Sequence, residues 1–359
     1  MGRKCRKCEK RRHLRKIVAA LTCAALITGL SSCGSSDSGY IINVSYDPTR
    51  ELYEEYNQLF AEHWKQQTGN DIEVIQSHGG SGKQALEVAN GLDADVVTLA
   101  LEADIDAVKD AGLIDGDFVD KFPLDSSPYT SAIVFLVRKD NPKNIHDWND
   151  LLRDDVGVIT PNPKTSGGAR WNYLAAWYYF EKQGQSEQQI EDSIKKLYQN
   201  VLVLDPGARG ATTSFVENRQ GDVLIAWENE AFLSLEENSG DYEIVVPSAS
   251  ILCQPTVAIV DEVVDMRDTR DVAEEYLNYL YSKKAQELEA KWYYRPTDES
   301  VLEKYEYQKD SNVIKDIPQD GKWIVTSVDL TDISHFGGWK EATKKHFADG
   351  GIFDSIYEK

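Results

Sequence analysis

The sequence predicts an α/β protein of two domains, one inserted into the other. Short apolar strand patterns alternate with helical patterns along most of the 359 residues, which is typical of α/β domains with mainly parallel sheets. Two long extended stretches, Tyr129–Val137 and Ser250–Val260, flank a central α/β series over residues 156–247. The chain therefore crosses twice between its two halves, and a discontinuous first domain encloses the second in sequence.

The two crossings set the expected domain boundaries. Domain 1 is expected at residues 41–127 and 257–359, and domain 2 at residues 128–256. With 41% hydrophobic residues, the chain is long enough for each domain to have its own core. Two lobes joined by two crossings also allow hinge closure around a ligand.

The first predicted helix has clear start and stop signals. The strand pattern Ile41–Tyr46 ends at Asp47, a residue type favoured as an N-cap, and Pro48 suits the first helical position. Gly69 lies where helices commonly end. Between these signals, one apolar stripe at helical spacing comprises Leu52, Tyr56, Leu59, Phe60 and Trp64.

The remaining elements follow from the same alternation of patterns. Strands are expected at residues 71–75, 95–101, 156–160, 201–204 and 222–226. Helices are expected at residues 84–90, 104–111, 272–281, 284–291 and 339–347.

Four times an apolar strand runs into a turn of small residues that opens a helix. These turns lie at residues 47–50, 77–83, 164–170 and 207–210. Each exposes unpaired backbone N–H groups at the positive end of a helix dipole, where anions bind favourably. Ligands in such folds sit beyond the carboxyl ends of the strands, which is where all four turns lie. The pattern indicates a protein that surrounds a small anion.

The residues near these turns do not form a catalytic motif. A Walker A loop requires Gly where Ser77 stands and Ser or Thr where Gln84 stands. His78 and Ser81 lack the G-x-S-x-G elbow of a nucleophilic triad. The histidines show no H-E-x-x-H spacing for a metal. We therefore expect a protein that is not an enzyme, with no catalytic residues, no cofactor and no metal.

For three further residues, the sequence spacing alone allows two interpretations of their role. Trp227 ends a strand pattern, so its indole N–H either faces the cleft as a donor or the ring simply packs in the core. Arg170 and Arg209 follow Gly-rich turns, and either brace those loops by bonding carbonyl groups or lie in solvent.

The N-terminus is a targeting segment. Residues 1–16 carry nine Lys or Arg residues against one acid, and an apolar stretch follows from Ile17 to Leu30. Small residues then precede Cys33 in an arrangement that resembles a bacterial lipobox, with a polar tether at residues 33–40. The interpretation is a signal peptide at residues 1–32, lipidation of Cys33, and a protein lipid-anchored to the cell membrane and facing outside the cytoplasm. An ordinary secretion signal with an incidental cysteine is the alternative.

Charge excludes one class of partner. Removal of residues 1–32 leaves 30 basic and 59 acidic residues, a net charge of −29. Nucleic acid is not expected as a partner, because its binding depends on Lys and Arg that neutralise phosphates. A small anionic ligand is still compatible, since dipoles act at contact distance while surface charges are screened. Of the five cysteines only Cys253 remains beside Cys33, so no intrachain disulfide is expected.

Long strings of the chain resemble the sulfate-binding proteins of bacterial ABC importers. The matching segments cover nearly all of residues 41–356 and are Asn43–Tyr53, Gln76–Gln84, Ile159–Tyr173, Asp205–Thr213, Gly221–Glu230, His335–Trp339 and His346–Gly351. The resemblance implies a two-lobed, type II-like periplasmic-binding-protein fold with the anion buried between the lobes. It also implies an ABC permease with its ATPase subunits as partners, and a monomeric receptor.

The resemblance further implies which groups bind the anion. Backbone N–H groups of Asp47, Ser81, Gly167, Gly168 and Ala208 are expected to donate, together with the Ser81 hydroxyl and the Trp227 indole. Arg170 and Arg209 are expected to hold the loops without touching the ligand.

The donor set suits an anion without a proton. Sulfate is a fully deprotonated dianion that offers only acceptors, whereas hydrogen phosphate keeps a proton and requires an acceptor in the site. Thiosulfate fits the same donors, and molybdate and phosphate are weaker alternatives. An enzyme on this fold is a further alternative, with Glu228 and Glu230 as the nearest acids in sequence.

Overall fold

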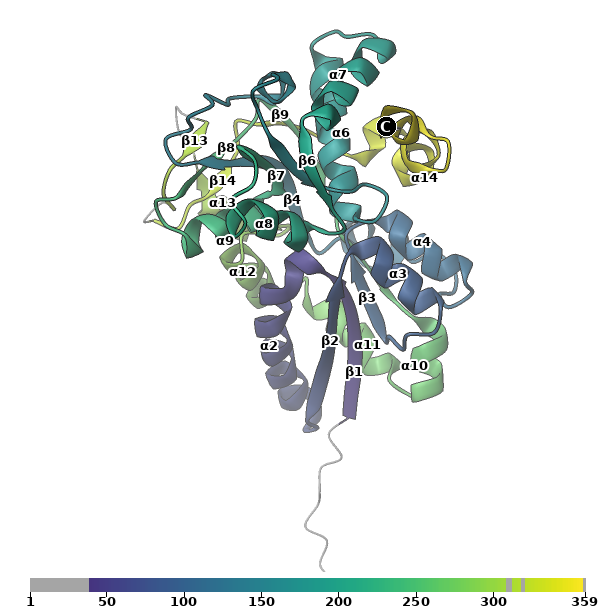
Figure 1. Ribbon diagram of the computed structural model, residues 1–359. Helices are drawn as coiled ribbons and strands as arrows, with labels where there is room; N and C mark the ends of the chain where they lie inside the picture. The colour runs from purple at the N-terminus through teal and green to yellow at the C-terminus, as the bar shows by residue number, and fades with distance from the viewer. Residues whose placement is uncertain (1–38, 308–311, 318–319, 358–359) are drawn as a thin grey trace, which may run out of the picture. The chain divides into compact units, whose positions relative to one another are not determined.

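The computed structural model describes residues 39–307, 312–317 and 320–357. The predicted signal peptide and Cys33 lie outside the described residues. Within the described chain, the helices and strands form two lobes, each built on its own sheet (Figure 1).

The first lobe contains a four-stranded sheet in the order β10-β3-β1-β2. Strand β1 (Gly39–Tyr46) is parallel to β2 (Ile72–Gly79) and to β3 (Val96–Leu99), whereas β10 (Thr256–Ile259) is antiparallel. Figure 1 shows α2 along one side of β1 and β2, with α3 and α4 on the other side. The helical elements here are η1 (Asp47–Thr49), α2 (Arg50–Thr68), α3 (Ser81–Ala89), α4 (Glu102–Asp110), η2 (Val119–Lys121), α5 (Pro123–Ser126), α10 (Asp261–Arg267), α11 (Arg270–Tyr279) and α12 (Lys283–Lys291).

The second lobe contains a mixed sheet whose main path runs β13-β8-β4-β7-β5-β6. Strand β5 is parallel to β6 and β7, and β4 is antiparallel to β7 and β8. The strands are β4 (Tyr129–Arg138), β5 (Val158–Pro161), β6 (Val201–Asp205), β7 (Val223–Trp227), β8 (Tyr242–Val245) and β9 (Ala249–Cys253). The helical elements are η3 (Trp148–Leu152), α6 (Gly167–Lys182), α7 (Glu187–Gln199), α8 (Ala208–Val216) and α9 (Glu228–Glu237).

The predicted extended stretch Ser250–Val260 is two strands in two different sheets. Strand β9 pairs with β4 in the second lobe, and β10 pairs with β3 in the first. Pro255 lies between them and has no N–H to continue a ladder. The stretch therefore crosses between lobes, as expected, but as an interrupted strand.

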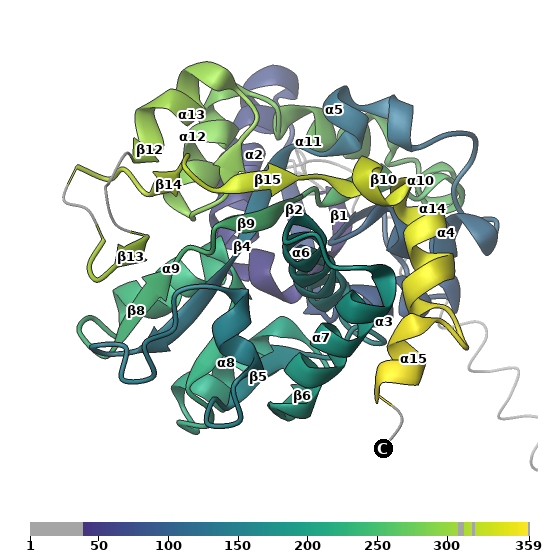
Figure 2. The same cartoon turned by 90° about the horizontal axis from the view of Figure 1, so that it is seen from above.

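The C-terminal segment packs on the second lobe, whereas the predicted boundaries placed residues 257–359 in the first. Strand β13 pairs with β8, and β15 pairs with β9, an arrangement that Figure 2 shows from above. The elements of this segment are β11 (Arg295–Pro296), α13 (Glu299–Tyr305), β12 (Glu306–Tyr307), β13 (Val313–Ile314), β14 (Ile324–Val325), β15 (Asp329–Thr331), η4 (Ile333–Phe336), α14 (Gly338–Ala342), η5 (Thr343–Phe347) and α15 (Ile352–Tyr357).

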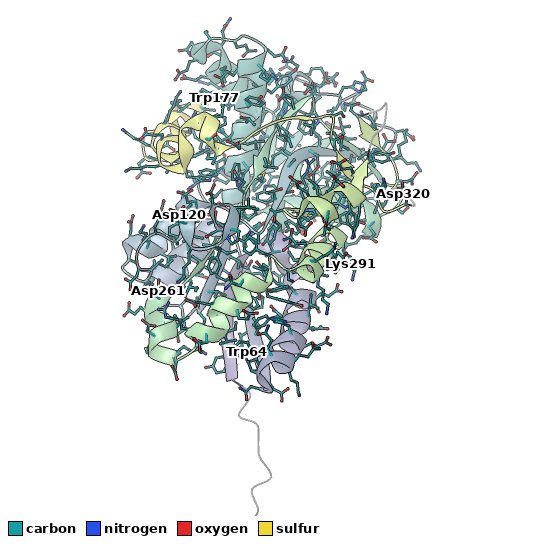
Figure 3. The ribbon with its side chains drawn as sticks, turned by 180° about the vertical axis from the view of Figure 1, so that it is seen from behind. Trp64, Asp120, Trp177, Asp261, Lys291 and Asp320 are labelled. Carbon is teal, nitrogen blue, oxygen red and sulfur yellow. The ribbon has the colours of Figure 1, made fainter. Side chains whose placement is uncertain are left out.

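Aromatic packing explains where this segment lies. Trp339 packs edge-on against Trp171 of α6 with ring centroids 4.6 Å apart. His346 packs in the same way on Trp177, which is labelled in Figure 3 beside the C-terminal helices, at 4.5 Å. Burial of these rings removes a large apolar area from water, and α6 in the second lobe provides the matching surface.

Most predicted element positions are confirmed, including the helix stop at Gly69, which caps α2 with φ of 78°. The predicted N-cap at Asp47 is wrong. Tyr46 is the N-cap, and Asp47 begins the 3-10 helix η1 that leads into α2. The Thr49 hydroxyl donates to the Tyr46 carbonyl at 2.7 Å, which supports this tight first turn.

The lobes have separate apolar cores that meet at the strand ends. Residues of α2, α11 and α12 surround one core, and residues of α6, β4 and the C-terminal segment surround another. The second core also includes Tyr46, Ala100 and Leu101 from the first lobe. The two lobes therefore make direct apolar contact beside the carboxyl ends of β1 and β3.

Candidate anion-binding site

The four helix-opening turns follow strand ends that face the junction of the lobes. Ser81, Gly167 and Ala208 are the first residues of α3, α6 and α8, and Gly168 follows Gly167. Asp47 is the first residue of η1. The first N–H groups of a helix have no carbonyl partner within that helix. Each turn therefore presents backbone donors toward the same region.

Close backbone approaches bring the turns of the two lobes together. A Cβ atom on Gly80 would lie 3.2 Å from the Thr165 carbonyl oxygen and 3.3 Å from that of Pro206. A Cβ atom on Gly207 would lie 2.9 Å from a carboxylate oxygen of Asp47. One glycine from the first lobe and one from the second thus allow all four turns to approach one another closely.

Gly167 makes the closest of these approaches. A Cβ atom there would lie 2.7 Å from Asp104 Oδ2, 3.0 Å from Leu101 Cγ and 3.1 Å from Ala100 Cβ. All three atoms belong to the first lobe. The absence of a side chain at Gly167 therefore permits α6 to begin against the first lobe.

Four of the six predicted donor residues border two cavities, whereas Ser81 and Gly167 line neither of them. Gly168, Ala208 and Trp227 line a small cavity of about 10 Å³, together with Asn172, Thr212 and Glu230. A cavity of that volume is about the smallest that can hold one water molecule. A larger cleft of about 730 Å³ is lined by Asp47, Gly80, Lys83, Asp104, Lys164, Arg170 and Gly207, among others.

The Ser81 hydroxyl is bonded within the protein. It donates to Asp104 Oδ2 at 2.5 Å and accepts from the Ala100 N–H at 3.0 Å. Asp104 is a residue that sequence reasoning missed, although it lies in the first turn of a helix after a central strand. It is buried, and burial raises the pKa of its carboxyl, against the opposing effects of Arg170 and Ser81.

The Trp227 indole is also bonded within the protein. Its N–H donates to the Gly168 carbonyl oxygen at 3.2 Å, so the strand end of β7 touches the start of α6. The ring lies 5.5 Å from that of Tyr46 in the first lobe. The two interpretations of Trp227, as a packed core residue and as a hydrogen-bond donor, are thus compatible. Its ring is buried, and its N–H lies at the wall of the cavity.

The two arginines have different partners. Arg170 Nε donates to the Pro163 carbonyl oxygen at 3.0 Å, and its guanidinium lies 3.8 Å from Asp104. Arg209 pairs with Glu51 of α2, across the junction of the lobes. Arg170 therefore contacts a carbonyl of the loop before α6, whereas Arg209 joins the lobes through a carboxylate.

Local charge at the site is mixed. Burial raises the pKa of Asp47, with Arg50, Arg209 and Lys83 acting in the opposite direction.

Among the residues that the structure describes, no group of three His, Cys, Asp or Glu residues could hold a metal ion. Helices long and apolar enough to cross a membrane are also absent from the described part of the chain.

Comparison with known proteins places this chain in a class. Residues 44–295 match the family model described as bacterial extracellular solute-binding protein. The chain is 55% identical to the sulfate-binding protein of Escherichia coli over 321 residues, which are 89% of this chain and 93% of that protein. It is 44% identical to the thiosulfate-binding protein of Pseudomonas aeruginosa over 92% of this chain and 96% of that protein. It therefore belongs to the bacterial extracellular solute-binding proteins and is not an enzyme.

A solved structure supports the same placement. The sulfate-binding protein SubI from Mycobacterium tuberculosis matches with a TM-score of 0.73 and 31% identity, covering 85% of this chain and 98% of that one. A periplasmic binding protein from Actinobacillus pleuropneumoniae, AfuA, matches with a TM-score of 0.62 at 18% identity, covers 85% of this chain and 96% of that one, and shows the shared fold alone. The two-lobed solute-binding fold predicted from the sequence is thus confirmed.

Gly167→Ala tests whether the close approach of the lobes is needed for binding. The added methyl group meets three first-lobe atoms at 2.7–3.1 Å, so it opposes closure. Overpacking costs about 1–3 kcal/mol, and we expect affinity for sulfate to fall roughly 5- to 150-fold in isothermal titration calorimetry. Gly82→Ala is the matched control, because its nearest neighbour is at an ordinary 3.5 Å. Equal affinity in both variants would contradict this role of Gly167.

Proposed function

We propose that this protein captures sulfate outside the cytoplasm and delivers it to an ABC importer. The observation that carries the proposal is the convergence of four helix-opening turns at the junction of two lobes. The 55% identity to the E. coli sulfate-binding protein over 89% of the chain supports sulfate as the ligand. A permease and its ATPase subunits are the proposed partners of a monomeric receptor.

Backbone donors suit a dianion in an acidic protein. N–H groups of Asp47, Ser81, Gly167, Gly168 and Ala208 are the proposed ligand set, with the Ser81 hydroxyl and the Trp227 indole. A hydrogen bond to a charged group contributes about 1.5–3 kcal/mol. Several such bonds supply the roughly 8 kcal/mol of a micromolar site. No cation is needed beside the ligand, in agreement with the high net negative charge.

Binding requires the two side-chain donors to change partners. The Ser81 hydroxyl exchanges Asp104 for the anion, and the Trp227 indole exchanges the Gly168 carbonyl for the anion. Because each donor gives up one acceptor to gain another, its net contribution is smaller than that of a free donor. The small cavity beside Gly168, Ala208 and Trp227 must also widen to accept four oxygens.

Thiosulfate is the second candidate ligand. The 44% identity to a thiosulfate-binding protein over 92% of the chain favours it over other oxyanions. Thiosulfate is a compact tetrahedral dianion that offers only acceptors, so the same donors serve both ligands. Molybdate and phosphate rank below these two.

Calorimetric titration of residues 41–359 with sulfate, thiosulfate, molybdate and phosphate tests the proposed function. We expect sulfate to bind with micromolar or tighter affinity, and phosphate to bind weakly because its proton meets mainly donors. Absence of binding to all four oxyanions would refute the receptor function. A preference for thiosulfate would change the proposed ligand but leave the proposed receptor function unchanged.

Trp227→Phe tests the proposed indole donor. The substitution removes one N–H and keeps the ring, so sulfate affinity should fall about 10-fold, or roughly 1.4 kcal/mol, while the protein stays folded. Trp148→Phe is the matched control, because the Trp148 indole also donates to a buried carbonyl, that of Ala249 at 2.9 Å, away from the turns. If both variants bind sulfate like the wild type, Trp227 serves only in packing.

We also propose that diacylated Cys33 anchors the receptor to the outer face of the cell membrane after removal of residues 1–32. The basic segment, the apolar segment and the small residues before Cys33 support this proposal. Cys33→Ser in the full-length protein should move the receptor from the membrane fraction to the soluble fraction of fractionated cells. Retention of the variant in the membrane fraction would contradict the anchor.

A further inference from the structure

We propose that the buried ion pair of Glu228 and Arg295 positions the Trp227 indole for the bound anion. The inference rests on the proposed function, because it concerns one of the proposed donors. It assigns a positioning role to two residues outside the expected donor set, which act through Trp227.

Helix α9 begins directly after Trp227 without a local cap. N-cap residues usually carry a side-chain oxygen that accepts a hydrogen bond from the first turn of the helix. An indole has no acceptor, and Trp227 makes no side-chain cap to α9. The start of α9, and with it the backbone that carries the indole, must therefore be fixed by contacts outside the helix.

The first turn of α9 consists of buried polar residues. Glu228, Asn229 and Glu230 are all buried, and glutamates are rarely buried unless they are paired. Arg295 donates to both carboxylate oxygens of Glu228, from Nε to Oε2 and from Nη2 to Oε1, each at 2.7 Å. A pair with two parallel bonds fixes the orientation of both groups as well as their distance.

The residues next to this pair are bonded to each other as well. The Asn229 side chain donates to the Tyr294 hydroxyl at 2.9 Å and to the Pro48 carbonyl oxygen at 3.2 Å. The Tyr294 hydroxyl donates to the same carbonyl oxygen at 2.8 Å. Two adjacent residues of α9 thus contact two adjacent residues after α12, and Asn229 also contacts η1, which begins with the proposed donor Asp47.

Arg295 is itself held by the sheet of the second lobe. It lies in β11, where it is opposite Thr130 of β4, and β4 also pairs with β7, where Ile133 is opposite Trp227. The Arg295 Nη2 group donates in addition to the Val325 carbonyl oxygen at 3.2 Å. Trp227 is therefore fixed on one side by its ladder with β4, and on the other by an ion pair that β11 connects to the same strand.

This arrangement matters because the indole N–H is a directional donor. It donates to the Gly168 carbonyl oxygen at 3.2 Å in the structure, and the proposed function requires it to reach the anion instead. Hydrogen bonds weaken steeply as the donor angle departs from linearity. A buried ion pair adds little stability relative to apolar residues of similar volume, so its presence beside a proposed donor favours a role in geometry.

Arg295→Lys tests the positioning role by titration calorimetry of the full chain with sulfate. Lysine keeps the positive charge but cannot form the two parallel bonds. We expect the affinity to fall roughly 3- to 10-fold, in the range of coupling between residues in contact. Arg267→Lys is the matched control, because Arg267 pairs with Asp95 at 2.5 Å and donates to the Tyr40 carbonyl oxygen at 3.1 Å, at the end of the first-lobe sheet away from the turns.

A double-mutant cycle assigns the effect to Trp227. The Trp227→Phe background has no indole N–H to position, so Arg295→Lys should there change the affinity by less than about twofold. Glu228→Gln weakens the pair from its other side and should give the same pattern. It replaces Arg295→Lys in the cycle if circular dichroism shows that the arginine variant does not fold.

The indole signal in an NMR spectrum gives a second readout. With ¹⁵N-labelled tryptophan the eight Trp residues each give one indole signal, and the signal absent from Trp227→Phe is that of Trp227. Saturating sulfate should shift this signal in the wild type and in Arg267→Lys. The shift should be smaller in Arg295→Lys, because the N–H no longer points directly at the anion.

The outcomes separate the two proposals. No sulfate binding by the wild type overturns the proposed function. Sulfate binding with unchanged affinity in Arg295→Lys and Glu228→Gln overturns only the positioning role. So does a loss that is equal with and without the Trp227 indole, or one that is matched by Arg267→Lys. An unchanged affinity in Trp227→Phe also overturns the positioning role, since no contribution of the indole is then left to position.

Discussion

The backbone contact between the lobes is the constraint on which the site depends. Gly80, Gly167 and Gly207 stand where a Cβ atom would meet the opposite lobe or turn at 2.7–3.3 Å. Backbone N–H groups from two lobes converge on one small ligand only if the turns of the two lobes approach each other this closely. The glycines are thus required by packing, and the exposed N–H groups follow from the same geometry.

Three carboxyl groups around the site each have a polar or charged partner. Asp104 accepts the Ser81 hydroxyl and lies near Arg170, Glu51 pairs with Arg209, and Glu228 pairs with Arg295. Each of these contacts also joins segments far apart in the sequence. The protein is strongly acidic overall, yet its junction keeps these charges compensated, which leaves the local N–H dipoles free to act on an anion.

The C-terminal segment contacts the loop before α6, which carries part of the expected site. Lys164, in the loop before α6, donates to the carbonyl oxygens of Phe347 and Ala348 at 2.9 and 3.3 Å and pairs with Asp354 at 2.6 Å. The Phe347 ring lies 5.5 Å from the Arg170 guanidinium. The tail therefore holds the loop that positions Gly167 and Gly168, so residues at the far end of the chain contribute to the geometry of the expected donors.

Local patterns in the sequence were sufficient for the elements that were predicted individually and for the helix-opening turns. Apolar periodicity, Gly69 at a helix end and small residues after strands depend on near neighbours, and the structure confirms those elements.

Non-local strand pairing was not predictable in the same way. The division of Ser250–Val260 between two sheets, and the packing of residues 313–357 on the second lobe, depend on partners distant in sequence. The bonds of Ser81 with Asp104, of Trp227 with Gly168 and of Glu228 with Arg295 exist only after folding. The sequence by itself thus determined where the helix-opening turns lie, and tertiary structure decided which acceptors stand beside them, because burial and charge pairing are set by contacts between distant segments.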